Sequence, residues 1–156
     1  MTFRKNIIRA CLINLFVCSL SYAAILSTPL DKLDYLYEQR DQPGKLMLCI
    51  NELNDALAST PAENTDLRYN ILWRIARTAS QVPIYVEASK KTRLTLIEAG
   101  MQAADQAHAL QPNAITPIYW KAIAVGRHAE LKGIMKSLRS IKPIRDSMLT
   151  CLLYTS

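Results

Sequence analysis

The sequence predicts an all-α fold, and three observations favour it. Good helix formers, namely Ala, Leu, Lys, Arg, Glu and Gln, are plentiful along the chain. Apolar residues recur at intervals of three and four, as they do on one face of a helix. Alternating runs of Val, Thr and Tyr, which are typical of exposed strands, are hard to find. With 156 residues, half of them apolar, the chain is long enough for one domain with its own core.

The first 23 residues have the pattern of a secretory signal peptide. A basic stretch over residues 1–9 precedes an apolar stretch over residues 10–20, and residues 21–23, Ser-Tyr-Ala, offer small residues to a signal peptidase. The apolar stretch is shorter than the roughly 20 residues that span a bilayer. We therefore expect cleavage after Ala23, or after Ala24, and a periplasmic or secreted protein with no membrane span after cleavage. An uncleaved anchor is the alternative.

The last six residues do not read as part of the fold. Residues 151–156, Cys-Leu-Leu-Tyr-Thr-Ser, resemble the translation of a transposon mosaic-end adaptor used in sequencing libraries. We therefore expect a non-native tail and a natural protein that continues beyond about Thr150. A natural apolar tail is the alternative. Residues 24–150 would then be a truncated helical domain, in which Pro143 opens a further helical segment.

Charge and cysteine content exclude several classes of protein. The formal net charge of +6 includes three basic residues of the expected signal peptide, so the mature balance is about +3. That excess is too small to predict nucleic-acid binding on charge alone. Cys11 and Cys18 fall in the signal peptide and Cys151 in the tail. Cys49 then remains single, so we expect no disulfide framework and a buried thiol at this position.

Helix signals between the two ends predict consecutive helix pairs. Thr28 offers a capping hydroxyl and Pro29 follows at the first helical position, while residues 42–44, Gln-Pro-Gly, break that helix. Two helices joined by such a tight turn form an αα-hairpin. The later helices are predicted over about 45–58, 66–80, 87–110, 115–128 and 130–141.

No residue constellation predicts catalysis or cofactor binding. His108 and His128 have no partners at metal-ligand spacing, and there is no Gly-rich phosphate loop or nucleophile motif. One face of the first helix carries four carboxylates at spacings of three, four and three residues: Asp31, Asp34, Glu38 and Asp41. Helical spacing spreads them along a rod instead of converging them on a point. We therefore expect no enzyme activity, no metal and no cofactor.

Two predicted hairpins end alike. In each, a small residue is followed by a position four residues later, an Ala seven later and a Pro twelve later: Cys49, Leu53, Ala56 and Pro61, then Gly100, Ala104, Ala107 and Pro112. This spacing matches the second helix of tetratricopeptide (TPR) repeats, whose period is about 34 residues. Pro61 and Pro112 are farther apart than one period, so we place an insertion near residues 81–89.

A narrower resemblance rests on two stretches of the later helices. These are residues 73–77, Trp-Arg-Ile-Ala-Arg, and residues 119–122, Tyr-Trp-Lys-Ala, followed by Gly126 and Gly133. Over about residues 30–148 the chain resembles the regulator-of-microtubule-dynamics family and its exported bacterial relatives. The resemblance implies TPR-like hairpins in a right-handed superhelical solenoid that serves as a scaffold. A microtubule role does not fit an exported protein, so we do not transfer that part of the family name.

Stacked hairpins leave a concave groove lined mainly by the first helix of each pair. We expect this groove to bind an extended or helical segment of a partner protein through charge complementarity and one aromatic anchor. A solvated polar face and internal contacts of Trp73 are the plainer interpretations. The expected groove residues are Asp31, Asp34, Glu38, Asp41, Trp73, Arg77 and Lys121.

Two other functions remain open. An accessory component of a solute transporter would bind an organic acid in a pocket rimmed by Trp73, Arg77 and Trp120. A cell-envelope assembly factor would act through self-association. The sequence does not decide the oligomeric state.

Overall fold

The computed structural model describes residues 29–133 and 141–155, and each element within these ranges is a helix. The chain divides into two compact units, residues 1–34 and 35–156, and the helices after α2 belong to the second unit. The all-α prediction is confirmed for the described residues. The helices are α2 (Pro29–Glu38), α3 (Lys45–Ser59), α4 (Thr65–Ser80), α5 (Val82–Tyr85), α6 (Lys90–Leu110), α7 (Ile115–Lys132) and α9 (Ile141–Thr155).

The turn after α2 begins earlier than the sequence predicts. The helix ends at Glu38, and the amide of Arg40 donates to the carbonyl of Tyr37 over 3.1 Å. Gly44, with φ of 76°, then precedes α3 in a left-handed conformation that glycine adopts at little cost. Asp41 therefore lies in the turn and not on the helix, so the predicted row of four carboxylates keeps three members on α2.

The expected insertion between α4 and α6 contains one helical turn and an extended segment. Val82, at the start of the single-turn helix α5, is fully buried, and the residues from Val86 to Ser89 adopt no regular structure. The Ser89 hydroxyl accepts a hydrogen bond from the Thr92 amide over 3.1 Å and so caps α6. The long helix consequently begins at Lys90, three residues later than predicted.

The predicted break between residues 128 and 130 is wrong. Helix α7 continues without interruption to Lys132, because neither Gly nor Pro occurs between His128 and Lys132. Gly133, with φ of 98°, ends the helix, and its amide donates to the Ala129 carbonyl over 3.0 Å. Most of the predicted sixth helix, residues 134–140, lies outside the described residues. The next helix, α9, has Pro143 in its first turn as expected.

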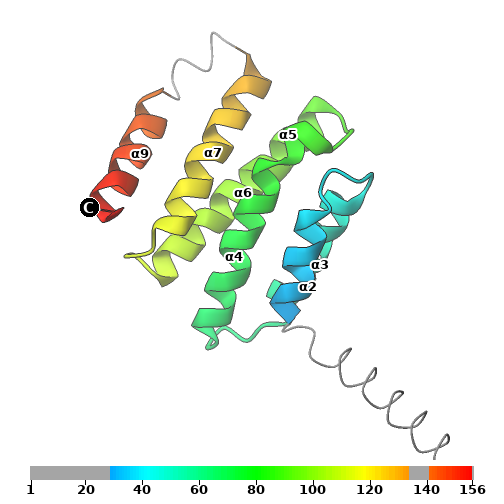
Figure 1. Cartoon of the computed structure of the whole chain (residues 1–156), viewed down its shortest axis with the longest axis horizontal. Helices are drawn as coiled ribbons and strands as arrows, with labels where there is room; N and C mark the ends of the chain where they lie inside the picture. The colour runs from blue at the N-terminus through cyan, green and yellow to red at the C-terminus, as the bar shows by residue number, and fades with distance from the viewer. Residues whose placement is uncertain (1–28, 134–140, 156) are drawn as a thin grey trace, which may run out of the picture. The chain divides into compact units, whose positions relative to one another are not determined.

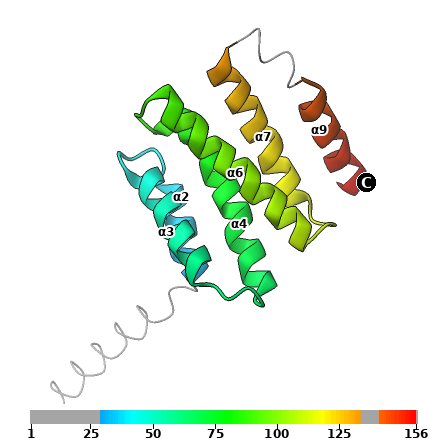
Figure 2. The same cartoon turned by 180° about the vertical axis from the view of Figure 1, so that it is seen from behind.

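Helix α4 is the central element of the second unit. It contacts α3, α6 and α7, while α6 also contacts α7 and α7 contacts α9. In Figure 1 helices α4 and α7 lie toward the viewer with α6 behind them. Figure 2, seen from behind, shows α6 in front of α4. The helices of this unit thus form two layers, with α4 and α7 side by side in one of them.

Small residues allow α4 and α6 to approach closely. A Cβ added to Gly100 would overlap the Cβ of Ala79, and Ala103, Ala104 and Ala107 of α6 are buried. Ala99, which precedes Gly100, is exposed. The α4–α6 contact therefore depends on the absence of side-chain volume at one position of α6.

The largest buried side chains of the core are aliphatic and come from α3, α4, α5 and α6. Cys49 is buried as expected, with its Sγ 3.9 Å from the Thr78 hydroxyl. Among the described residues, no helix combines the length and the apolar character that crossing a membrane requires. The largest fully buried aliphatic side chains are Leu46, Leu53, Ile71, Leu72, Val82 and Ile97.

Candidate functional site

A series of alternating arginine and aromatic side chains lies on α4 and at the end of α2. The guanidinium carbons of Arg40 and Arg77 lie 4.7 and 3.8 Å from the ring centroid of Tyr37. Arg77 also lies 5.1 Å from the ring of Trp73, and Arg74 lies 4.2 Å from the same ring. Each contact of this kind contributes about 0.5–1 kcal/mol at an exposed site. We call these five residues the arginine–aromatic stack.

Asn70 fixes the outer end of this stack. Its side-chain oxygen accepts a hydrogen bond from the Trp73 indole N–H over 3.3 Å and another from Arg74 Nη1 over 3.3 Å. Arg74 Nη1 also donates to the Asn70 backbone carbonyl over 2.9 Å. Residues three and four apart are neighbours on a helix, so the Asn70–Trp73–Arg74 spacing places these groups together. The sequence analysis did not select Asn70, although this spacing was visible.

Tyr37 forms the inner end of the stack. Burial raises the pKa of its phenol, and the positive charges of Arg40 and Arg77 partly offset that effect. The phenol therefore stays neutral beyond the range in which a solvated tyrosine ionises. Arg40 is also held by a hydrogen bond from its Nη1 to the Tyr37 carbonyl oxygen over 3.3 Å.

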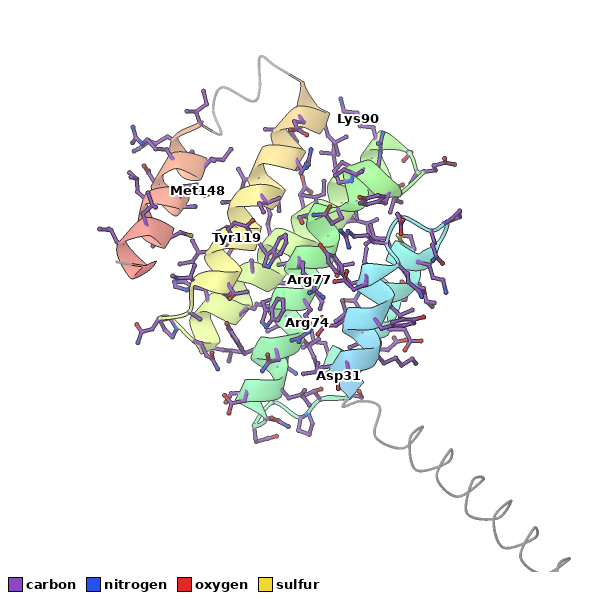
Figure 3. All side chains as sticks on the ribbon, in the orientation of Figure 1. Asp31, Arg74, Arg77, Lys90, Tyr119 and Met148 are labelled. Carbon is purple, nitrogen blue, oxygen red and sulfur yellow. The ribbon has the colours of Figure 1, made fainter. Side chains whose placement is uncertain are left out.

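Helix α7 adds a further aromatic group beside α4. Tyr119 is 43% exposed, and its ring lies 5.0 Å from that of Trp120 at 76°, an edge-to-face arrangement. Figure 3 shows Tyr119, Arg74 and Arg77 on the face of these two helices that is turned to the viewer. We define the α4–α7 surface as Asn70, Trp73, Arg74, Arg77 and Tyr119.

Two of the predicted groove residues, Trp73 and Arg77, meet on this surface. Lys121 is not part of this surface. Its ammonium group pairs with Asp105 of α6 and so lies at the contact between α6 and α7. Glu38 is exposed, and its carboxylate oxygen Oε2 lies 3.7 Å from Nη1 of Arg40. Asp31 and Asp34, which belong to the first unit, are exposed and half-buried respectively.

A cleft of about 720 Å³ lies away from the α4–α7 surface. It is lined by the turn after α2, including Asp41, by residues 83–88 and by Arg93. None of the residues proposed to rim a small-ligand pocket, Trp73, Arg77 and Trp120, lines it. Its volume falls within the range of about 300–1,000 Å³ that is common for ligand sites.

No cluster that could hold a metal ion occurs in the part of the chain that the structure describes. His128 instead contacts Glu98 of α6, with 2.8 Å between Nε2 and the carboxylate oxygen. This hydrogen bond lowers the pKa of the Glu98 carboxyl, and the nearby Lys132 adds to the effect. The Glu98–His128 pair thus joins α6 and α7.

A family model described as Regulator of microtubule dynamics protein 1-3 matches residues 30–152. The matched range includes the α4–α7 surface and the cleft. No match was found among curated proteins or among solved structures.

Proposed function

The chain belongs to the family described as Regulator of microtubule dynamics protein 1-3, and on this premise we propose that it is a scaffold that binds another protein. The binding site is the α4–α7 surface. Its occupant is an extended or helical segment that places an apolar or aromatic side chain against Trp73 and Tyr119. Hydrogen-bond acceptors of the same segment face the guanidinium groups of Arg74 and Arg77.

The arginine–aromatic stack is the observation that carries this proposal. Trp, Tyr and Arg are the residues most often found to dominate the energy of protein interfaces. Here Asn70 holds Trp73 and Arg74, and Arg77 is stacked between Tyr37 and Trp73. Side chains that are already ordered lose less conformational entropy when a partner binds. The surface therefore offers preorganised anchors on two adjacent helices.

The same proposal includes a repeat architecture for the helices. Helix α4 contacts both α6, its expected hairpin partner, and α7, the first helix of the next pair. Contacts between neighbouring hairpins are typical of solenoids, because one hairpin cannot bury its apolar face alone. The close approach at Gly100 and the buried Ala107 are consistent with TPR-like pairs in a right-handed array.

We also propose export, with residues 1–23 as a cleaved signal peptide. These residues lie outside the described part of the chain, so the basic and apolar pattern of the sequence alone supports this step. The mass of the protein recovered from the periplasm or medium tests it. Retention of residues 1–23 in that protein would contradict cleavage.

Variants of the α4–α7 surface test the proposed binding site. Trp73→Ala and Tyr119→Ala should each abolish cross-linking to the same partner from the cell envelope, measured by quantitative mass spectrometry. Tyr35→Ala is the matched control, because Tyr35 is 64% exposed and lies outside the surface. Circular dichroism checks that each variant remains folded. Unchanged partners in both surface variants would reject the α4–α7 surface as the binding site.

A further inference from the structure

The cleft introduced above lies between two segments that are far apart in the sequence. One is the turn between α2 and α3 with the start of α3, which contribute Pro43 and Met47, and the other is the stretch from α5 to α6. Figures 1 and 2 both show these two segments side by side at one end of the helices. Turn residues and the ends of helices thus bound the cleft, whereas the α4–α7 surface is formed by helix faces.

One wall of the cleft is an extended backbone segment. Val86 has φ of −110° and ψ of 113°, an extended conformation, and the residues from Val86 to Ser89 belong to no helix. Within the described residues, the backbone N–H and C=O groups of Glu87 and Ala88 take part in no hydrogen bond. An extended backbone with unused donors and acceptors can pair with an incoming peptide as an added strand.

The same wall carries two exposed apolar side chains. Ile84 is 49% exposed and Tyr85 is 36% exposed, and both line the cleft. Large apolar side chains at a cleft rim gain energy when an apolar side chain of a partner covers them. This pair therefore favours a partner segment in which apolar side chains alternate with polar ones.

Two exposed carboxylates line the cleft. Asp41 and Glu87 are both exposed, and neither forms an ion pair with another described residue. The cleft also contains Arg93, but its Nη1 donates to the Pro83 carbonyl over 3.5 Å and its Nε is shielded from solvent. A cationic partner is therefore complementary to the rim.

We infer that this cleft binds an extended peptide segment with basic and apolar side chains, at a site separate from the α4–α7 surface. The peptide backbone pairs with Glu87 and Ala88. Its apolar side chains cover Ile84 and Tyr85, while lysine or arginine side chains approach Asp41 and Glu87. This occupant uses all three properties of the cleft, whereas a small cation would use the charges alone.

Fluorescence anisotropy with a short labelled peptide of alternating leucine and lysine tests the inference. The peptide should bind saturably to the purified chain, and D41N/E87Q should weaken binding by about five- to tenfold, as expected for two exposed ion pairs. Glu63→Gln removes an exposed carboxylate outside the cleft and should leave the affinity unchanged. Trp73→Ala should also bind normally, because Trp73 does not line the cleft.

Three further probes distinguish the occupants. A leucine–glutamate peptide and a backbone N-methylated leucine–lysine peptide should both bind at least tenfold more weakly. Lysine amide alone should bind far more weakly than the peptide. Backbone amide shifts in an NMR titration should concentrate at residues 41–47 and 83–93.

Four outcomes would overturn the inference. The first is that the leucine–lysine peptide shows no saturable binding, and the second is that the leucine–glutamate peptide binds with equal affinity. The third is that D41N/E87Q and Glu63→Gln lose equal affinity for the leucine–lysine peptide. The fourth is that lysine amide binds as tightly as that peptide.

Discussion

The contacts of α6 with α4 and with α7 depend on different physical principles. Against α4, it presents Gly100 and buried alanines, so that contact depends on steric fit. Against α7, it presents two carboxylates, Asp105 and Glu98, which pair with Lys121 and with His128. The stability of the α4–α6 contact should change when a single methyl group is added, and it should barely depend on salt or pH. The stability of the α6–α7 contact should depend on salt and pH, and it should tolerate changes in side-chain volume at the edge of the contact.

The largest expected effect comes from Gly100→Ala. The added Cβ overlaps that of Ala79, and overpacking of this kind costs about 1–3 kcal/mol of unfolding free energy. Urea denaturation followed by circular dichroism measures the loss. The double variant G100A/A79G should recover most of it, because the second change removes the overlapping atom.

Gly126→Ala is the matched control for this prediction. Its added Cβ would lie 3.8 Å from Ile144 Cδ1, an ordinary contact, and the position is inside α7. Replacing a helical glycine where alanine fits should stabilise the chain by about 0.4–1 kcal/mol. Equal destabilisation by the two glycine substitutions would show that steric fit is not what distinguishes the α4–α6 contact.

Acid should weaken the α6–α7 contact through Glu98. In the folded chain the hydrogen bond to His128 lowers the pKa of this carboxyl below its usual value, so the stabilisation is present above the usual pKa. It is lost as the pH falls through the lowered pKa. A pH series of urea denaturation should therefore show a smaller acid-induced loss for Glu98→Gln than for the unmodified chain. Identical slopes for both proteins would contradict this role of the Glu98–His128 pair.

The smallest expected effect comes from Lys121→Met. The Lys121–Asp105 pair is exposed, and such pairs contribute about 0.2–1 kcal/mol and are screened by salt. The variant should lose a few tenths of a kcal/mol of unfolding free energy at low salt and almost nothing at high salt. The same substitution should leave partner binding at the α4–α7 surface intact. Loss of partner binding would return Lys121 to the site that the sequence analysis proposed.

Local signals predicted most of the helices. Asn64 caps α4 just before its predicted range, because its side chain accepts a hydrogen bond from the Leu67 amide over 3.2 Å. Pro61 and Gly44 likewise lie where the preceding helix has ended. The failure at residues 128–130 arose from placing a helix boundary where no residue breaks the helix. Asp41 was misplaced because the turn after α2 begins before the Pro-Gly pair.

The candidate site was only half predictable. Trp73 and Arg77 are four residues apart on α4, so helical spacing alone grouped them. Tyr37 joins them through its contact with Arg77 between α2 and α4, which no local spacing contains, and Arg40 follows through Tyr37. Lys121 was assigned to the groove from its position in the repeat, whereas its side chain pairs with the carboxylate of Asp105 on the neighbouring helix. Long-range pairing is information that a single sequence does not carry.

The segment between Val82 and Ser89 is anchored at both ends. Val82 is fully buried, and the Ser89 hydroxyl caps α6. The residues in between can therefore vary in sequence and length without shifting the register of α6 against α4. In engineering terms this is a graft position, where a foreign recognition loop could be inserted while the helical frame that presents it keeps its geometry.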